Sequence, residues 1–180
     1  MLSYNVADLL RSAPGTSEVF RIDAERFVID DDVSVAAPVQ GTVRLANTGR
    51  GVLARGHLTT AFAETCSRCL ADTLAPVELD FTEEALPSVD LESGEALVHE
   101  ADPEILLLDD HHELDLTATV RDAISLAEPI VVLCRPDCRG LCLTCGIDLN
   151  ADASHTHGED DLDPRLAALV AIREQLGPPA

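Results

Sequence analysis

The sequence contains no tryptophan and no lysine, and its 180 residues include only one tyrosine and four phenylalanines. A hydrophobic core must therefore be aliphatic, and the chain is long enough to bury a substantial one, because a protein of this size loses roughly 70 % of its unfolded surface on folding. Without lysine, all twelve basic residues are arginines, against 33 acidic residues. The net charge of −21 repels nucleic-acid phosphates and suits a basic protein partner, unless it serves only to prevent self-association.

A long apolar run is also missing at the start of the chain. Residues 1–14 include one arginine and only short apolar stretches, so neither a secretory signal nor a membrane-spanning helix is expected there. The expected location is therefore the cytoplasm. Because the cytosol is reducing, the six cysteines are expected to be metal ligands rather than three disulfides.

Apolar periodicity predicts an α+β fold, mainly an antiparallel β-sheet built from hairpins, which could be barrel-like. Residues 47–51 have the composition of a hairpin turn. Alternation indicates strands within residues 19–29, 39–46, 52–65 and 73–82, and the apolar run 130–133 indicates a short buried strand.

Three helices are expected beside this sheet. A short N-terminal helix spans residues 5–11 with Asn5 as its cap, and a central helix spans residues 116–128 with Asp115 as its cap. A C-terminal helix begins at Asp163-Pro164. Residues 1–180 are interpreted as a single domain.

Residues 83–115 have an unusual charge. They contain twelve acidic residues and no arginine, and the apolar residues 105–108 interrupt them. This composition predicts a mobile acidic loop with one short docked strand. Disorder is the simpler explanation of the composition, and a binding site for a basic partner is the alternative.

Cysteine and histidine pairs predict a zinc-binding protein with two sites. Cys66-Ser-Arg-Cys69 lies at the tip of a predicted antiparallel hairpin, and residues 134–158 form a zinc-knuckle region. Zinc prefers four thiolate or imidazole ligands in tetrahedral geometry. Eight candidates suffice for two Zn²⁺ ions: Cys66, Cys69, Cys134, Cys138, Cys142, Cys145, His155 and His157.

The eight candidates can be divided between the ions in two ways. An interleaved division pairs Cys66 and Cys69 with Cys142 and Cys145. Loop lengths and ligand spacing favour the other division, with Cys66, Cys69, Cys134 and Cys138 in one site and Cys142, Cys145, His155 and His157 in the second. Gly146 allows a left-handed turn through which backbone amides can point at a cysteine sulfur.

Other cysteine chemistries fit this sequence less well. A thioredoxin-type redox pair needs a βαβ setting, whereas antiparallel strands are predicted here. The spacings also differ from the common iron–sulfur runs. A catalytic zinc needs an open coordination position, and eight ligands for two ions leave none. The remaining histidines are expected to be surface residues: His57, His99, His111 and His112.

The order of these motifs resembles the YceD family. The resemblance rests on Cys66-Ser-Arg-Cys69-Leu70, on the predicted helix from Asp115 to Pro129, on Leu133-Cys134-x-x-x-Cys138-x-Gly140-Leu141-Cys142-x-x-Cys145-Gly146, and on Asp163-Pro164-Arg165-Leu166-Ala167. The motif His155-x-His157 resembles the motif found in the actinobacterial branch of this family. The family is associated with accumulation of large-subunit ribosomal RNA, so the resemblance implies a non-enzymatic factor in large-subunit biogenesis.

Two functional hypotheses follow. In the first, the protein is an acidic adaptor whose residues 83–115 hold a basic ribosomal protein or assembly factor. In the second, the zinc-knuckle region binds ribosomal RNA directly through Arg135, Arg139 and Arg68. An enzyme such as a ribonuclease is a third class, but no acid–base constellation is recognisable beyond the general excess of acidic residues.

Overall fold

A computed structural model describes residues 2–25, 28–30, 33–99 and 105–157 of the chain. These residues divide into two compact units. The first comprises the residues up to Cys66 together with Ala71–Cys134, and the second comprises Ser67–Leu70 together with the residues from Arg135 onward. Within the described residues, no helix has the length and apolar character needed to span a membrane.

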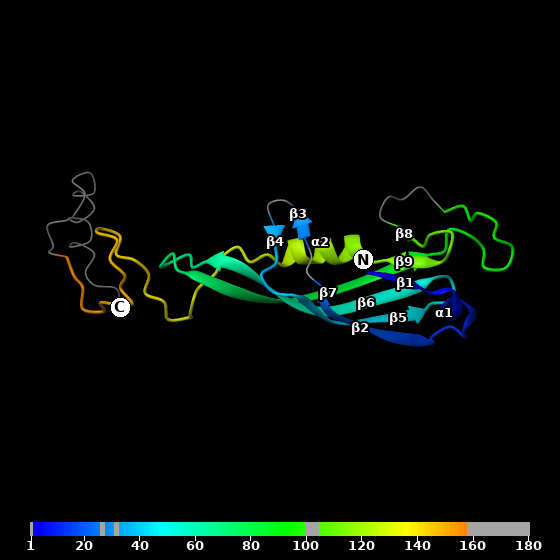
Figure 1. The fold of residues 1–180 in the computed structure, drawn as a ribbon, viewed down its shortest axis with the longest axis horizontal. Coiled ribbons are helices and arrows are strands. Elements are labelled where there is room, and N and C mark those ends of the chain that lie inside the picture. The colour runs from blue at the N-terminus through cyan, green and yellow to red at the C-terminus, as the bar shows by residue number, and fades with distance from the viewer. Residues whose placement is uncertain (1, 26–27, 31–32, 100–104, 158–180) are drawn as a thin grey trace, which may run out of the picture. The chain divides into compact units, whose positions relative to one another are not determined.

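The described strands and helices all lie in the first unit. They are β1 (Ser3–Asn5), α1 (Ala7–Arg11), β2 (Ser17–Glu25), β3 (Val28–Asp30), β4 (Val33–Ser34), β5 (Val39–Asn47), β6 (Val52–Thr65), β7 (Asp72–Leu86), β8 (Leu106–Leu107), β9 (Glu113–Asp115) and α2 (Thr117–Ala127). The main sheet has the order β2-β5-β6-β7-β8 (Figure 1). Its strands are antiparallel neighbours except for β8, which runs parallel to the end of β7. Two small pairs accompany it, β1 with β9 and β3 with β4.

Alternation along the strands gives the main sheet one apolar face and one polar face. In β6, the buried residues Ala54 and Leu58 alternate with the exposed residues Arg55 and His57. Helix α2 covers the apolar face (Figure 1), and its Ile124 lies fully buried in the same core. The core is mostly aliphatic, as the sequence predicts.

Phe81 is one of the few aromatic residues in this core, and it packs over the backbone of Gly56. The two residues are opposite each other in the register of β7 and β6. A Cβ atom at position 56 would lie 2.0 Å from Phe81 Cε1. Glycine at position 56 therefore leaves room for the aromatic ring on the face that α2 covers.

The predicted strands at 39–46 and 52–65 and the two predicted helices at 5–11 and 116–128 are confirmed, with small shifts of their ends. The expected caps are wrong by one position, because the N-cap residues are Val6 in α1 and Leu116 in α2, and neither makes a side-chain cap hydrogen bond. Asn5 and Asp115 nevertheless each accept a hydrogen bond from the first residue of the helix. Asn5 Oδ1 accepts the Ala7 N–H at 3.2 Å, and Asp115 Oδ1 accepts the Thr117 N–H at 2.8 Å. The helix expected from Asp163 lies outside the described residues.

Three expectations about the fold are wrong. The sheet is open rather than barrel-like, because its outer strands in the described part of the chain, β2 and β8, do not pair with each other. Strand β7 continues to Leu86, and residues 83–115 also contribute β8 and β9 rather than one short strand. Residues 130–133 form no strand, because no described strand pairs with them. Ile130 and Val131 are 99 % and 67 % exposed.

The buried side chain of Asn47 connects the end of β5 to the end of α1. Its amide nitrogen donates to the carbonyl oxygens of Leu9, Leu10 and Ser12 at 2.9, 3.1 and 2.9 Å. Its Oδ1 accepts the Gly49 N–H. Carbonyl groups at the end of a helix lack intrahelical donors, so this one side chain satisfies several backbone groups that the fold removes from water.

We expect Asn47→Ala to lower the free energy of unfolding by about 2–4 kcal/mol, because each buried polar group that loses its partner costs about 1–3 kcal/mol. Urea unfolding followed by circular dichroism measures the change. The matched control is Asn5→Ala, which removes exposed hydrogen bonds and should cost about 1 kcal/mol or less. Equal losses in the two variants would contradict the role assigned to Asn47.

Candidate metal centres

The two Cys-x-x-Cys motifs form turns of the same kind. The first cysteine of each motif donates its N–H to the carbonyl oxygen five residues later, at 2.9 Å for Cys66 and 2.8 Å for Cys142. The residue after the second cysteine has a positive φ in both, 58° at Leu70 and 75° at Gly146. Both motifs therefore have a tight turn from which two thiols can reach one metal ion.

The eight candidate ligands converge in two groups. Within each group, one ligand atom from every residue lies within 4.8 Å of the others. The groups are Cys66, Cys69, Cys134 and Cys138, and Cys142, Cys145, His155 and His157. The sequence favours this division, and the structure does not bring the ligands together in the interleaved one. None of the six cysteines forms a disulfide.

The second group, with two cysteines and two histidines, has the donor set of a structural zinc site. Cys142 Sγ lies 3.1 Å from His157 Nε2, and Cys145 Sγ lies 3.1 Å from His155 Nε2. The two Nε2 atoms are 2.9 Å apart. Zinc bond lengths of about 2.3 Å to sulfur and about 2.0–2.1 Å to nitrogen put tetrahedral ligand atoms roughly 3.5 Å apart. These three separations are somewhat shorter than that value, so a small widening would bring the four side chains to the spacing of zinc ligands.

Backbone amides prepare Cys142 to bind a metal ion. The N–H groups of Cys145 and Thr144 donate to its sulfur, and with the side chains of Cys145 and His155 they lower the pKa of the Cys142 thiol to about 6. A cysteine must be deprotonated to bind zinc, so Cys142 is ready to do so at neutral pH. The turn at Gly146 thus directs amides at sulfur, as its sequence predicts.

The described residues of the second unit have almost no apolar core. Only Cys138 and Gly140 are buried among residues 67–70 and 135–157. Gly140 has a φ of 78° and lies against Arg68, where an added Cβ would be 2.9 Å from the Arg68 carbonyl oxygen. The same oxygen accepts the Leu141 N–H at 3.1 Å. Backbone hydrogen bonds therefore define this unit more than apolar packing does.

Asn150 is a candidate site residue that sequence reasoning missed. Its amide nitrogen donates to Cys138 Sγ at 3.5 Å and to Asp148 Oδ1 at 2.7 Å. Its Oδ1 accepts the Arg139 N–H and an Arg135 N–H, both at 2.8 Å. Hydrogen bonds of this kind, from residues that do not themselves bind the metal, orient the metal ligands. The pair Asp148-x-Asn150, typical of an Asx turn, is the sequence signal that could have located it.

The other histidines lie outside both groups. His57 and His111 are exposed, as expected, whereas His99 and His112 are half-buried. His57 Nδ1 lies 2.9 Å from Asp80 Oδ1, and this hydrogen bond raises the pKa of His57 above its ordinary value.

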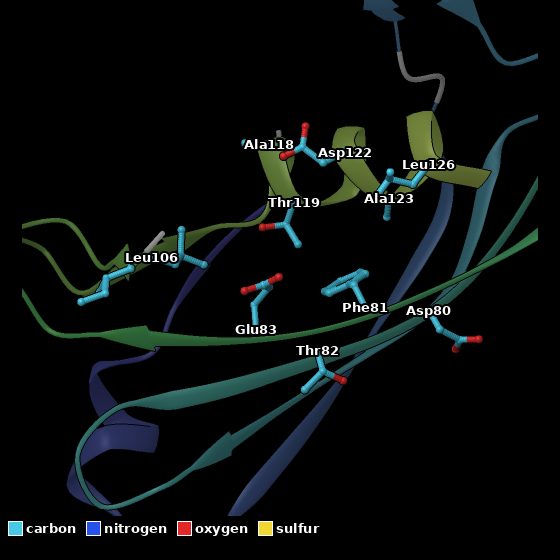
Figure 2. Close-up of a pocket in the computed structure, with 11 residues that line it drawn as sticks. Asp80, Phe81, Thr82, Glu83, Leu106, Ala118, Thr119, Asp122, Ala123 and Leu126 are labelled. Atoms are coloured by element: carbon cyan, nitrogen blue, oxygen red, sulfur yellow. The ribbon is translucent and has the colours of Figure 1, made fainter. Parts of the chain in front are cut away.

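A groove of about 550 Å³ lies between β7 and α2 in the first unit (Figure 2). Phe81, Leu106 and Leu126 give it an apolar lining, and Leu126 is 88 % exposed. Glu83 lines it from β7 and Asp122 lines it from α2. Within the described part of the chain, neither carboxylate has a cation at ion-pair distance. The groove therefore combines apolar surface with unpaired negative charge.

Several known proteins are similar to this chain. A protein of Mycobacterium tuberculosis, named only as uncharacterized, is 33 % identical over 159 residues, which is 88 % of this chain and 70 % of the relative. In Arabidopsis thaliana, the chloroplastic large ribosomal RNA subunit accumulation protein YCED homolog 1 is 26 % identical over 166 residues, covering 81 % of this chain and 51 % of the relative. The Zea mays protein of the same name is 46 % identical over 44 residues, 24 % of this chain and 15 % of the relative. No solved structure is significantly similar to the chain.

The family profile described as large ribosomal RNA subunit accumulation protein YceD matches residues 54–173. This span includes all eight candidate ligands. The mycobacterial relatives agree with the actinobacterial branch that the His155-x-His157 pair indicates. The chain belongs to the YceD family.

Proposed function

We propose that the protein is a non-enzymatic, zinc-binding factor in the biogenesis of the large ribosomal subunit, acting in the cytoplasm as an acidic adaptor for a basic protein. Membership of the YceD family carries the first part of this proposal, because the plant relatives are named as large ribosomal RNA subunit accumulation proteins. The basic protein would be a ribosomal protein or an assembly factor.

The proposal of zinc rests on the two ligand groups and on what surrounds them. Each group offers four thiolate or imidazole donors, which is the number that a closed structural zinc site uses. The second unit buries almost no apolar side chain, so it needs another source of folding free energy. A structural zinc ion contributes about 10–16 kcal/mol in small zinc-dependent folds.

The non-enzymatic part of the proposal follows from the number of protein ligands in each group, which is four. A catalytic zinc keeps one position for water or substrate, whereas four protein ligands fill a tetrahedral site. The family is also named for an effect on ribosomal RNA accumulation and not for a reaction. Zinc would therefore have a structural role, stabilising the fold, and the surfaces of that fold would bind partners.

The adaptor part of the proposal is supported by the groove between β7 and α2. Its unpaired carboxylates, Glu83 and Asp122, flank the apolar side chains of Phe81 and Leu126. A segment of the partner that carries both basic and apolar residues would match both features of the groove. The net charge of −21 on this chain would raise the rate at which a basic partner associates and would disfavour acidic competitors.

The alternative, direct RNA binding by the zinc-knuckle region, receives less support. The arginines that it requires are engaged within the chain. Arg68 donates to the Cys138 carbonyl oxygen at 2.8 Å and Arg139 to the Ala153 carbonyl oxygen at 3.1 Å. Arg135 donates to Asn150 and lies 3.4 Å from a carboxylate oxygen of Asp137.

Native mass spectrometry of the full chain should detect two zinc ions. We expect Cys66→Ser and Cys142→Ser each to retain one ion, because the two residues belong to different groups. The double variant separates the two possible divisions of the ligands. It should retain no ion under the observed grouping and one ion under the interleaved grouping, so a double variant with one bound zinc overturns the assignment.

Zinc removal should affect the second unit selectively. After chelation, we expect amide hydrogen exchange of residues 135–157 to accelerate at least tenfold, since little apolar packing remains to protect them. Strands β5 and β6 should keep their protection. Unchanged exchange in residues 135–157 after chelation would show that zinc does not stabilise this region.

The groove predicts a salt-sensitive interaction with a basic ribosomal protein. In a pull-down from a lysate at low salt, such a protein should be recovered by the native chain, and recovery should fall at least fivefold with Glu83→Gln/Asp122→Asn. The control is Glu92→Gln/Glu95→Gln, which changes net charge equally on exposed residues away from the groove. If both double variants lose the partner alike, net charge and not the groove is responsible.

Depletion of the protein in its own cells tests the role in biogenesis. We expect large-subunit ribosomal RNA to fall relative to small-subunit RNA, with a deficit of large subunits in sucrose gradients. A normal ratio of the two subunits after depletion would contradict the proposed function.

A further inference from the structure

The uncovered polar face of the main sheet carries a cluster of arginines. Val19, Arg44, Arg55 and Thr82 form one row across β2, β5, β6 and β7, because each is the register partner of the next. The register places Arg21 in the adjacent row, opposite Thr42. Three arginines therefore lie together on one exposed face.

The row next to Arg44 and Arg55 also contains His57 and Asp80, which are register partners. Asp80 is the carboxylate nearest to the cluster in these two rows, and it is hydrogen-bonded to His57 at 2.9 Å. The Asp80 carboxylate therefore contacts the imidazole rather than a guanidinium group.

The cluster is unusual for this chain. Among the described residues, no carboxylate lies within ion-pair distance of Arg21, Arg44 or Arg55, although acidic residues outnumber arginines by 33 to 12. Arg44 donates to a neutral oxygen, Ser17 Oγ, at 3.1 Å. By contrast, Arg11 pairs with Asp8 and Arg50 with Glu84.

The positions of Arg44 and Arg55 are also unfavourable in the free protein. They are directly opposite each other on neighbouring antiparallel strands, and like charges at such positions repel. Bound anions would remove this repulsion. A shallow hollow of about 360 Å³ is lined by Arg44 and Arg55, by Val19, Thr42 and Thr82, and by the hydrogen-bonded pair of His57 and Asp80.

We infer that this cationic face, formed by Arg21, Arg44 and Arg55, binds the phosphate backbone of RNA. Guanidinium groups bind phosphate oxygens through paired hydrogen bonds and suit phosphate recognition better than a point charge does. The two rows hold no phenylalanine, tyrosine or tryptophan, and the imidazole of His57 is hydrogen-bonded to Asp80, so binding should depend mainly on phosphate contacts and little on base sequence. The choice of RNA among polyanions rests on the proposed function.

The net charge of the chain does not exclude this site. Salt screens exposed charges over about 8–10 Å at physiological ionic strength, so the nearest groups determine the local potential. The binding will be weak, because distant carboxylates repel the same RNA when salt is low. It will depend on salt, because each phosphate contact releases counterions.

The test is fluorescence anisotropy of a labelled single-stranded RNA of about 12 nucleotides with the full zinc-loaded chain. Three phosphate contacts predict that raising salt from about 50 to 200 mM weakens native binding about twentyfold. Arg44→Gln/Arg55→Gln keeps only Arg21, so its binding should be weaker at low salt and should change only about threefold over the same range. Its melting temperature should be unchanged or higher, because the variant removes a repulsion and leaves the core intact.

The control variant is Arg11→Gln/Arg50→Gln, which has the same net charge and changes arginines away from the cluster. It should bind RNA like the native chain. The inference is overturned if no RNA binding is detected at low salt, if both double variants lose binding equally, or if a polyglutamate of similar length displaces the RNA at equal charge concentration. These outcomes leave the pull-down and depletion tests of the proposed function unaffected.

Discussion

The pairing of β6 with β7 is the constraint on which the functional surfaces depend. Its register runs without a break from Val52 opposite Ala85 to Thr65 opposite Asp72. Such a register fixes which side chains share a face, because a slip of one residue would move every side chain to the other face. It places Cys66 directly after the last paired residue of β6, where the backbone closes the turn that carries two of the thiols. It also places Phe81 on Gly56, beside α2.

The same register divides the side chains of β7 between the two faces of the sheet. Phe81 and Glu83 face α2 and line the acidic groove, whereas Asp80 and Thr82 lie on the polar face with His57 and Arg55. An extended strand alternates its side chains between faces, so one strand contributes to two different surfaces. The two proposals use these two surfaces separately, with the basic partner at the groove and the RNA backbone on the polar face.

Local patterns were sufficient to predict the hairpin, both helices of the first unit and the ligand grouping. Turn composition at residues 47–51, a residue such as Asp115 near the start of a helix and the spacing of cysteines all act over a few residues. The features that were missed depend on contacts between distant segments. Strands β1 and β9 are three residues each and pair across more than a hundred positions, and Asn47 reaches carbonyl groups of α1. The cationic face emerges only when the registers of three strand pairs are known.

The strand predicted at residues 130–133 is absent, which shows that composition can mislead when no neighbouring strand is available for pairing. Apolar β-branched residues favour strands because they pack on a pleated, half-buried surface, and that surface requires a neighbouring strand. No such neighbour is present among the described residues, and Ile130 is almost fully exposed. The segment that leads to Cys134 therefore derives little order from its own apolar side chains, and only Val132 is buried. Cys134 itself lies among the three other thiols of its group. If this group binds zinc as proposed, the ion would add an interaction that orders the chain on either side of that cysteine.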